Sequence, residues 1–127
     1  MSRLQPVRDS GQTLPGLRGM IIGIVDTAAQ LDDVVVNLES GGFSAENMVC
    51  LHGDDGVSLV KRVDGSFFGD NENGIGKKSI AAMQQGKYAL GVKVDNGDEA
   101  RRAATLAGEK GGHGFVHFGL FVSTQFN

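Results

Sequence analysis

The sequence predicts an α+β domain with an antiparallel sheet, built from two strand–helix–strand units. Strands are indicated by residues that alternate between apolar and other types, and helices by apolar stripes at helical spacing. The second unit also repeats the plan of the first, since Val25-Asp26, a helix and Gly41-Gly42 correspond to Val94-Asp95, a helix and Gly111-Gly112. Two such units indicate the ferredoxin-like split βαβ topology, a four-stranded antiparallel sheet with two helices on one face.

The first unit covers residues 20–52. A strand over 20–25 is followed by Asp26 and Thr27, whose side chains can cap a helix. The helix is predicted to end at Gly41-Gly42, because glycine adopts the left-handed conformation without steric cost. Its apolar stripe consists of Ala28, Leu31, Val34, Val35 and Leu38. Residues 48–52 then form a second, short strand.

The second unit covers residues 88–122. A strand from Tyr88 to Val94 precedes Asp95, Asn96 and Asp98, which suit the start of a helix. The stripe of this helix consists of Ala100, Ala103, Ala104, Leu106 and Ala107. Gly111-Gly112 ends the helix, and the last strand is predicted from about residue 114 to residue 122.

Two further segments complete the predicted organisation. Residues 19–127 form one domain, and residues 1–18 form a flexible, locally basic N-terminal arm. The arm is either a mobile tail or a segment that lies along a partner or a neighbouring subunit. Residues 53–87 form a long connector with a turn at 53–56 and short helices near 57–63 and 77–85. Connectors of this length with structure of their own are often lids, binding loops or partner contacts.

Composition narrows the class of protein. The chain has 127 residues, enough for one core, and a formal net charge of -3, which argues against general nucleic-acid binding. No apolar run approaches the length that spans a bilayer, and no secretory signal is recognisable at the N-terminus. The single Cys50 excludes an internal disulfide and an iron–sulfur cluster. We therefore expect a cytoplasmic protein without membrane insertion.

The sheet face away from the two helices is predicted to be apolar and in need of a cover. The helix side would hold Ile22, Ile24, Leu90, Val92, Val94, Val116, Phe118 and Leu120. The open side would show Ile21, Gly23, Val25, Ala89, Gly91, Lys93, Phe115, His117, Gly119 and Phe121. Three covers are possible: the connector, a second copy of the sheet, or a ligand. Interface residues would be Ile21, Val25, Phe67, Phe68, Phe115 and Phe121, and a ligand pocket would use Lys93, Phe115, His117 and Phe121.

No spacing of residue types predicts catalysis or a metal. Cys50-His52 and the two histidines of the last strand would lie on opposite edges of the sheet, too far apart for one ion. The segment GIGKKS at residues 74–79 fails the phosphate-loop pattern, so Lys77 and Lys78 predict at most a nonspecific anion site. Asp26 and Asp95 are better explained as helix caps. We expect no cofactor.

Several of these segments resemble a family of small bacterial general stress or heat-induced stress protein domains. The similarity rests on Val94-Asp95, the helix that ends in Gly111-Gly112, and HFG at residues 117–119. The first unit matches through GIVDTAAQLDDVVVNLESGGFSAENMVCL, and the resemblance covers residues 20–52 and 75–122. It implies the fold and a stress context, and it assigns no catalytic residue.

The sequence therefore predicts a non-enzymatic interaction or accessory module. It would form a homodimer or dock on a larger assembly through its open sheet face and its N-terminal arm. The alternative is a ligand-binding protein or enzyme of the dimeric α+β barrel kind, with a pocket on the open face. This alternative rests on fold analogy alone.

Overall fold

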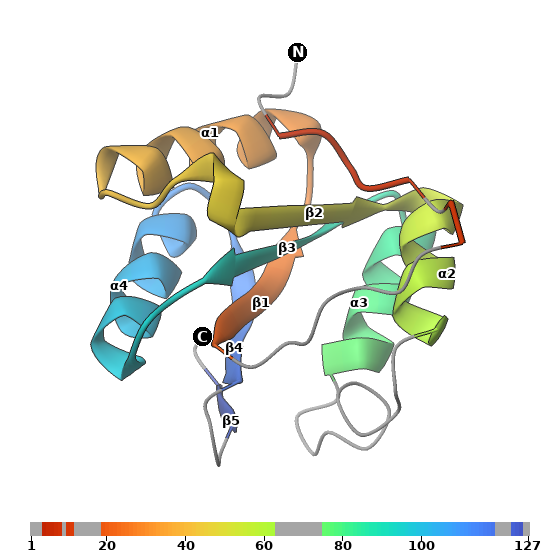
Figure 1. The fold of residues 1–127 in the computed structure, drawn as a ribbon. Helices are drawn as coiled ribbons and strands as arrows, with labels where there is room; N and C mark the ends of the chain where they lie inside the picture. The colour runs from red at the N-terminus through yellow and green to blue at the C-terminus, as the bar shows by residue number, and fades with distance from the viewer. Residues whose placement is uncertain (1–3, 9, 12–18, 63–74, 119–122, 126–127) are drawn as a thin grey trace.

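A computed structural model describes residues 4–8, 10–11, 19–62, 75–118 and 123–125. Its elements are β1 (Met20–Val25), α1 (Ala28–Ser40), a 3-10 turn (Ala45–Asn47), β2 (Met48–His52), α2 (Gly53–Arg62), α3 (Ile75–Gln84), β3 (Tyr88–Lys93), α4 (Gly97–Gly108), β4 (His113–Phe118) and β5 (Ser123–Gln125). The α+β class and the antiparallel sheet are confirmed. Figure 1 shows the sheet between two pairs of helices.

The strands lie in the order β2-β3-β1-β4-β5. The first four have the order that the split βαβ prediction requires, and each neighbouring pair is antiparallel. The fifth strand, β5, was not predicted and pairs antiparallel with β4, so that β4 is not the edge of the sheet. The predicted last strand ends at Phe118 in the structure, and residues 119–122 lie outside the described residues.

The larger core lies between the sheet and the helices α1 and α4. The stripe of α1 buries Leu31, Val34, Val35 and Leu38. The small side chains of α4 let it approach closely: Ala100, Ala103, Ala104 and Ala107 are buried. The sheet contributes Ile21, Val25, Cys50, Leu90, Val92, Val94 and Phe115. The two helices of the repeat therefore share one face, as predicted.

The connector covers the opposite face. Helices α2 and α3 pack on each other and on β2 and β3, and they enclose a smaller core (Figure 1). That core consists of Ile22, Leu51, Leu59, Val60, Met83, Ala89 and Val116. The residues predicted as a turn, 53–56, are the first turn of α2. Of the three covers considered for this face, the structure shows the connector, which leaves no sheet surface for a second copy or a ligand over this core.

The structure also corrects which side chains of β1 and β4 face the helices α1 and α4. Ile21, Val25 and Phe115 are fully buried in the larger core, whereas Ile22 and Val116 belong to the smaller one. The sequence MIIGIV is apolar at both parities, so periodicity does not show which set of β1 side chains faces the repeat helices. Ile21, Val25 and Phe115 are consequently core residues, and the predicted role of these residues at an exposed interface is wrong.

Gly23 shows how Phe115 reaches this position. A Cβ placed on Gly23 would overlap the Phe115 ring, so the ring lies directly over the bare backbone of β1. The register between β1 and β4 shifts between Ile22 and Ile24, next to this contact. Glycine is needed at residue 23 because the aromatic ring occupies the space of a side chain.

The helix caps differ in part from the prediction. The Thr27 hydroxyl accepts a hydrogen bond from the Gln30 N–H at 3.1 Å and caps α1. Asn96 caps α4, since its side-chain oxygen accepts from the Glu99 N–H at 2.9 Å. Asp26 and Asp95 were predicted to cap and do not. The Glu99 carboxylate accepts from the Asp95 N–H at 2.8 Å, which tightens the same turn.

Candidate functional site: the N-terminal arm, the β2 edge and the adjoining cleft

The N-terminal arm, residues 4–8, lies along the outer side of β2. Pro6 and Cys50 form a parallel bridge, in which the Val7 N–H donates to the Cys50 carbonyl at 2.9 Å. Proline has no N–H, and it is tolerated where a strand meets solvent at the edge of a sheet. The arm thus pairs, through one isolated bridge, with the edge where β2 would otherwise end the sheet (Figure 1).

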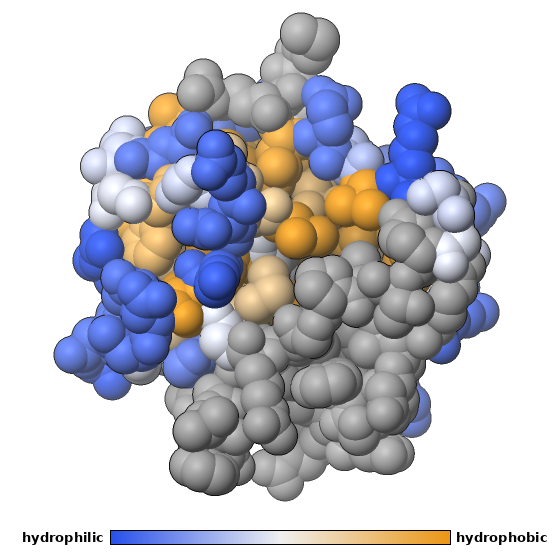
Figure 2. Space-filling view, in the orientation of Figure 1, coloured by the Kyte–Doolittle hydropathy of each residue, from blue (hydrophilic) through white to orange (hydrophobic). Residues whose placement is uncertain are grey.

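Side chains of the arm contact both cores. Leu4 packs against the larger core and Val7 packs against the smaller one. The arm therefore covers the edge of β2 at the point where the two helix layers separate. Apolar surface, shown in orange in Figure 2, comes to the exterior in the region where Figure 1 places the arm and β2, and both Val7 and Val49 are half-buried there.

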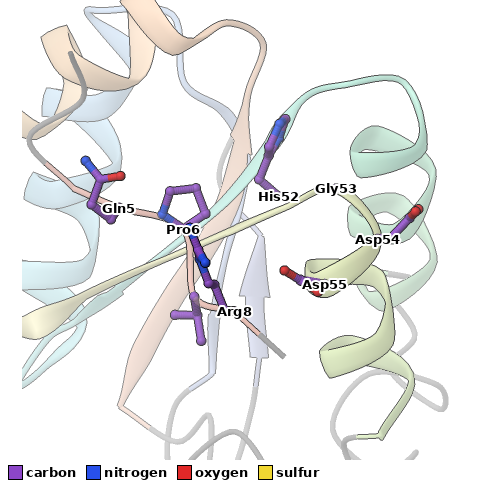
Figure 3. A pocket seen from close by; sticks show the side chains of 8 residues that line it. Gln5, Pro6, Arg8, His52, Gly53, Asp54 and Asp55 are labelled. Carbon is purple, nitrogen blue, oxygen red and sulfur yellow. The ribbon is translucent and has the colours of Figure 1, made fainter. Parts of the chain in front are cut away.

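A cleft with a volume of about 530 Å³ separates the arm from the start of α2. It is lined by Gln5, Pro6, Val7, Arg8, His52, Gly53, Asp54 and Asp55. In Figure 3 the Asp55 carboxylate is directed from α2 towards the arm, whereas Asp54 points away from it. The cleft therefore places one basic residue of the arm opposite the acidic first turn of α2.

His52 forms the inner end of the cleft and is held by two contacts. Its Nδ1 lies 2.9 Å from the Lys87 carbonyl oxygen. A carbonyl oxygen only accepts hydrogen bonds, so Nδ1 carries the hydrogen and donates it. The ring also stacks on Tyr88 with centroids 4.0 Å apart. These contacts fix the ring next to Gly53, where β2 turns directly into α2 with a positive φ of 65°.

A row of ionisable residues continues from His52 across the end of the sheet. The Asp26 carboxylate lies 2.8 Å from His113 Nε2 and 3.6 Å from Lys87 Nζ. The hydrogen bond from His113 is the main reason that the pKa of Asp26 lies below its ordinary value, and the charge of Lys87 acts in the same direction. All three side chains are partly exposed, so this row is polar and accessible.

Sheet register brings the row together. Val25 pairs with Tyr88 and Ile24 pairs with His113, so the end of β1 meets the starts of β3 and β4. The contact between Asp26 and His113 was not predicted, because the local sequence explains Asp26 as a helix cap. The signal was present: in the predicted strand order, the residue after β1 and the first residue of its antiparallel neighbour β4 share one end of the sheet.

Of the four residues predicted to line an open-face pocket, Lys93, Phe115 and His117 are described. Phe115 is buried, and His117 is half-buried with a pKa lowered by desolvation. Lys93 is exposed and lines a different hollow of about 250 Å³ with Phe43, Asp95 and Glu99, among others. Phe121, like Phe67 and Phe68, lies outside the described residues.

The structure assigns no chemical role to the predicted anion site or to the thiol of Cys50. Lys77 and Lys78 are both exposed in the first turns of α3, and their predicted anion binding stays a prediction. Cys50 is fully buried, and desolvation raises the pKa of its thiol to about 12, so it is a poor nucleophile in the folded chain. Within the described ranges, no group of three His, Cys, Asp or Glu side chains could hold a metal ion.

These features define an α+β domain with both sheet faces covered and a polar site at the edge of β2. Comparison with protein-family models, with curated proteins and with solved structures finds no match. The resemblance to stress-associated domains therefore stays a prediction. None of the helices in the described part of the chain has the length and apolar character needed to cross a membrane.

Proposed function

We propose that this domain is a non-enzymatic interaction module that binds an extended peptide segment of a protein partner at the edge of β2. The site is the place where the domain's own arm now lies. The observation that supports this proposal most directly is the backbone pairing of the arm with β2 through Pro6, Val7 and Cys50.

An outer strand offers a row of N–H and C=O groups to any extended chain. At the other edge of the sheet, β5 pairs with β4 over three residue pairs. The β2 edge is covered less completely, by a single described bridge at Cys50. A partner strand that makes more backbone bonds there, or the same bonds with better side-chain contacts, would displace the arm.

The arm predicted from the sequence remains part of the proposed docking site, whereas the predicted open sheet face does not. Residues Ile21, Val25 and Phe115 are enclosed by α1 and α4, so they offer no docking surface. The helices α2 and α3 close the opposite side of the sheet over the smaller core. Association through the arm and the β2 edge requires neither face to open.

The test uses the full chain with Val7→Pro, which removes the N–H that bonds to Cys50 and so weakens docking of the arm in its own chain. A synthetic peptide of residues 1–11 is then titrated against this variant, with binding followed by fluorescence anisotropy or calorimetry. A flexibly tethered segment has an effective concentration on the order of millimolar, so the titration must extend to that range. We expect saturable binding to the variant and weaker apparent binding to the wild-type chain, whose own arm competes.

The matched control is the same peptide with an N-methylated Val7, which keeps the side chain and removes the donor. We expect it to bind at least about tenfold more weakly, because the carbonyl of the buried Cys50 loses its partner. Equal binding of the two peptides, or no binding of either one, would show that the β2 edge does not accept an extended chain.

A further inference from the structure

The cleft beside the arm indicates which peptides the β2 edge selects. Resting on the function proposed above, we infer that the partner is an extended segment in which an apolar residue is followed directly by a basic residue. The apolar residue would occupy the position of Val7 and the basic residue the position of Arg8. The specificity would come from the smaller core and from the carboxylate of Asp55.

The first part of this inference rests on the position of Val7. Its N–H donates to Cys50, and its side chain packs against the cluster that contains Leu51 and Leu59. One residue therefore makes both the backbone bond and the apolar contact. A peptide that pairs with β2 in the same register must place an apolar side chain there to bury the same surface.

The second part rests on charge complementarity across the cleft. Arg8 lines the cleft from the arm, and Asp54 and Asp55 line it from the first turn of α2. Figure 3 shows that only the Asp55 side chain is directed to the arm. The cleft of about 530 Å³ leaves room for a long side chain between the two elements. A cationic group at this position is attracted by the carboxylate, and an acidic one is repelled.

The position of Pro6 explains why the motif begins with Val7. The bridge between Pro6 and Cys50 forms although proline has no N–H to donate. The site therefore requires no donor from the residue before the apolar one, and it requires a donor from the apolar residue itself. The dipeptide Val7-Arg8 contains both the residue that donates to Cys50 and the basic residue that lines the cleft.

The experiment compares peptides of residues 1–11 that differ only at residue 8, titrated against the full chain with Val7→Pro. We expect Arg8→Lys to bind within about twofold of the original peptide and Arg8→Glu to bind about fivefold to tenfold more weakly, an effect that decreases with added salt. In the reciprocal variant, Asp55→Lys added to Val7→Pro should reverse the order and favour the Arg8→Glu peptide.

Asp98→Asn, also added to Val7→Pro, serves as the matched control. It removes an exposed carboxylate from the first turn of another helix, α4, and so changes the net charge without changing the cleft. We expect this control to leave the ranking of the peptides unchanged. If all three peptides bind equally well, or if Asp98→Asn acts as strongly as a change at Asp55, the selectivity is absent while the peptide-binding function stands. If the original peptide does not bind at all, both proposals fall.

Discussion

The two faces of the sheet are built differently although both are buried. The face under α1 and α4 is covered by helices that belong to the strand–helix–strand repeat, and the cluster there includes residues from β1, β2, β3 and β4. The face under α2 and α3 is covered by an inserted connector, and its cluster is smaller. One sheet can therefore have two cores, one formed by its own repeat and one added by an inserted segment.

The two cores also meet different neighbours. The larger core is enclosed mainly by α1 and α4, with Leu4 of the arm packed against it and Phe115 against Gly23. The smaller core reaches the β2 edge, where Val7 of the arm packs against it. The arm therefore contacts both layers, through a different residue in each. Because the repeat encloses one core and an insertion encloses the other, we expect the two layers to differ in stability. Three substitutions test this difference, and a fourth serves as a reference.

Leu90→Ala should cause the largest loss. Leu90 is fully buried in the larger core, on a strand that pairs with both β1 and β2. A Leu→Ala change at such a site costs about 3–5 kcal/mol, because the cavity cannot collapse against a rigid sheet. Chemical denaturation monitored by circular dichroism would measure the change in the free energy of unfolding. A loss below about 2 kcal/mol would mean that the two cores do not differ as described.

Leu59→Ala is the matched change in the smaller core, since Leu59 is equally buried but lies on α2. We expect a loss of about 2–3 kcal/mol, at the lower end for this substitution, because a two-helix layer can relax into the cavity. Hydrogen exchange should become faster in α2 and α3 before it does in α1 and α4.

The thiol of Cys50 provides a control for the same variant. Cys50 belongs to the larger core, and burial raises the pKa of its thiol to about 12. Opening of α2 and α3 alone should therefore leave the thiol unreactive towards alkylating reagents. If Leu59→Ala accelerates labelling of Cys50 as much as it accelerates exchange in α2, the two layers open together and the distinction between them is lost.

The repeat core was predictable because its signals are local. The stripe of α1 and the alanines of α4 have helical spacing, and Leu90 and Val92 of β3 face these helices as predicted. The sequence did not show which side chains of β1 face these helices. Isoleucine or valine occurs at both parities of β1, so the choice depends on the contact between Phe115 and Gly23, which are far apart in sequence.

The candidate site was predictable only in part. The arm was predicted as a mobile tail or as a segment along a partner or neighbouring subunit, and nothing local in Pro6 or Val7 identifies β2 of the same chain as its neighbour. Asp26 and His113 meet because of sheet register, and each residue alone has an ordinary local explanation. Sites assembled from residues distant in sequence require the topology first, whereas caps and stripes require only the neighbouring residues.

Gly23→Ala tests the contact that distinguishes the larger core. The added methyl group would overlap the Phe115 ring, and overpacking of this kind costs about 1–3 kcal/mol. Gly108→Ala is the matched control, since a Cβ at the end of α4 meets open space and alanine has the higher helix propensity. We expect the control to be neutral or stabilising by up to about 1 kcal/mol when both variants are measured by chemical denaturation. Equal effects at the two positions would contradict the close packing at Gly23.

Asp26→Asn should have the smallest effect and should not distinguish the two faces, because Asp26 lies at the end of the sheet that both cores share. Its carboxylate contacts His113 and Lys87 while partly exposed, so we expect a loss of only about 0.2–1 kcal/mol at pH 7. The pKa of Asp26 is lower in the folded chain than its ordinary value of 3.8, so its contribution is complete above that pH and is lost as the pH falls through the lowered folded value. Stability curves of the wild type and the variant should therefore run parallel near neutral pH and converge in acid. A difference that persisted below the folded pKa would show that Asp26 stabilises the sheet through its shape rather than its charge.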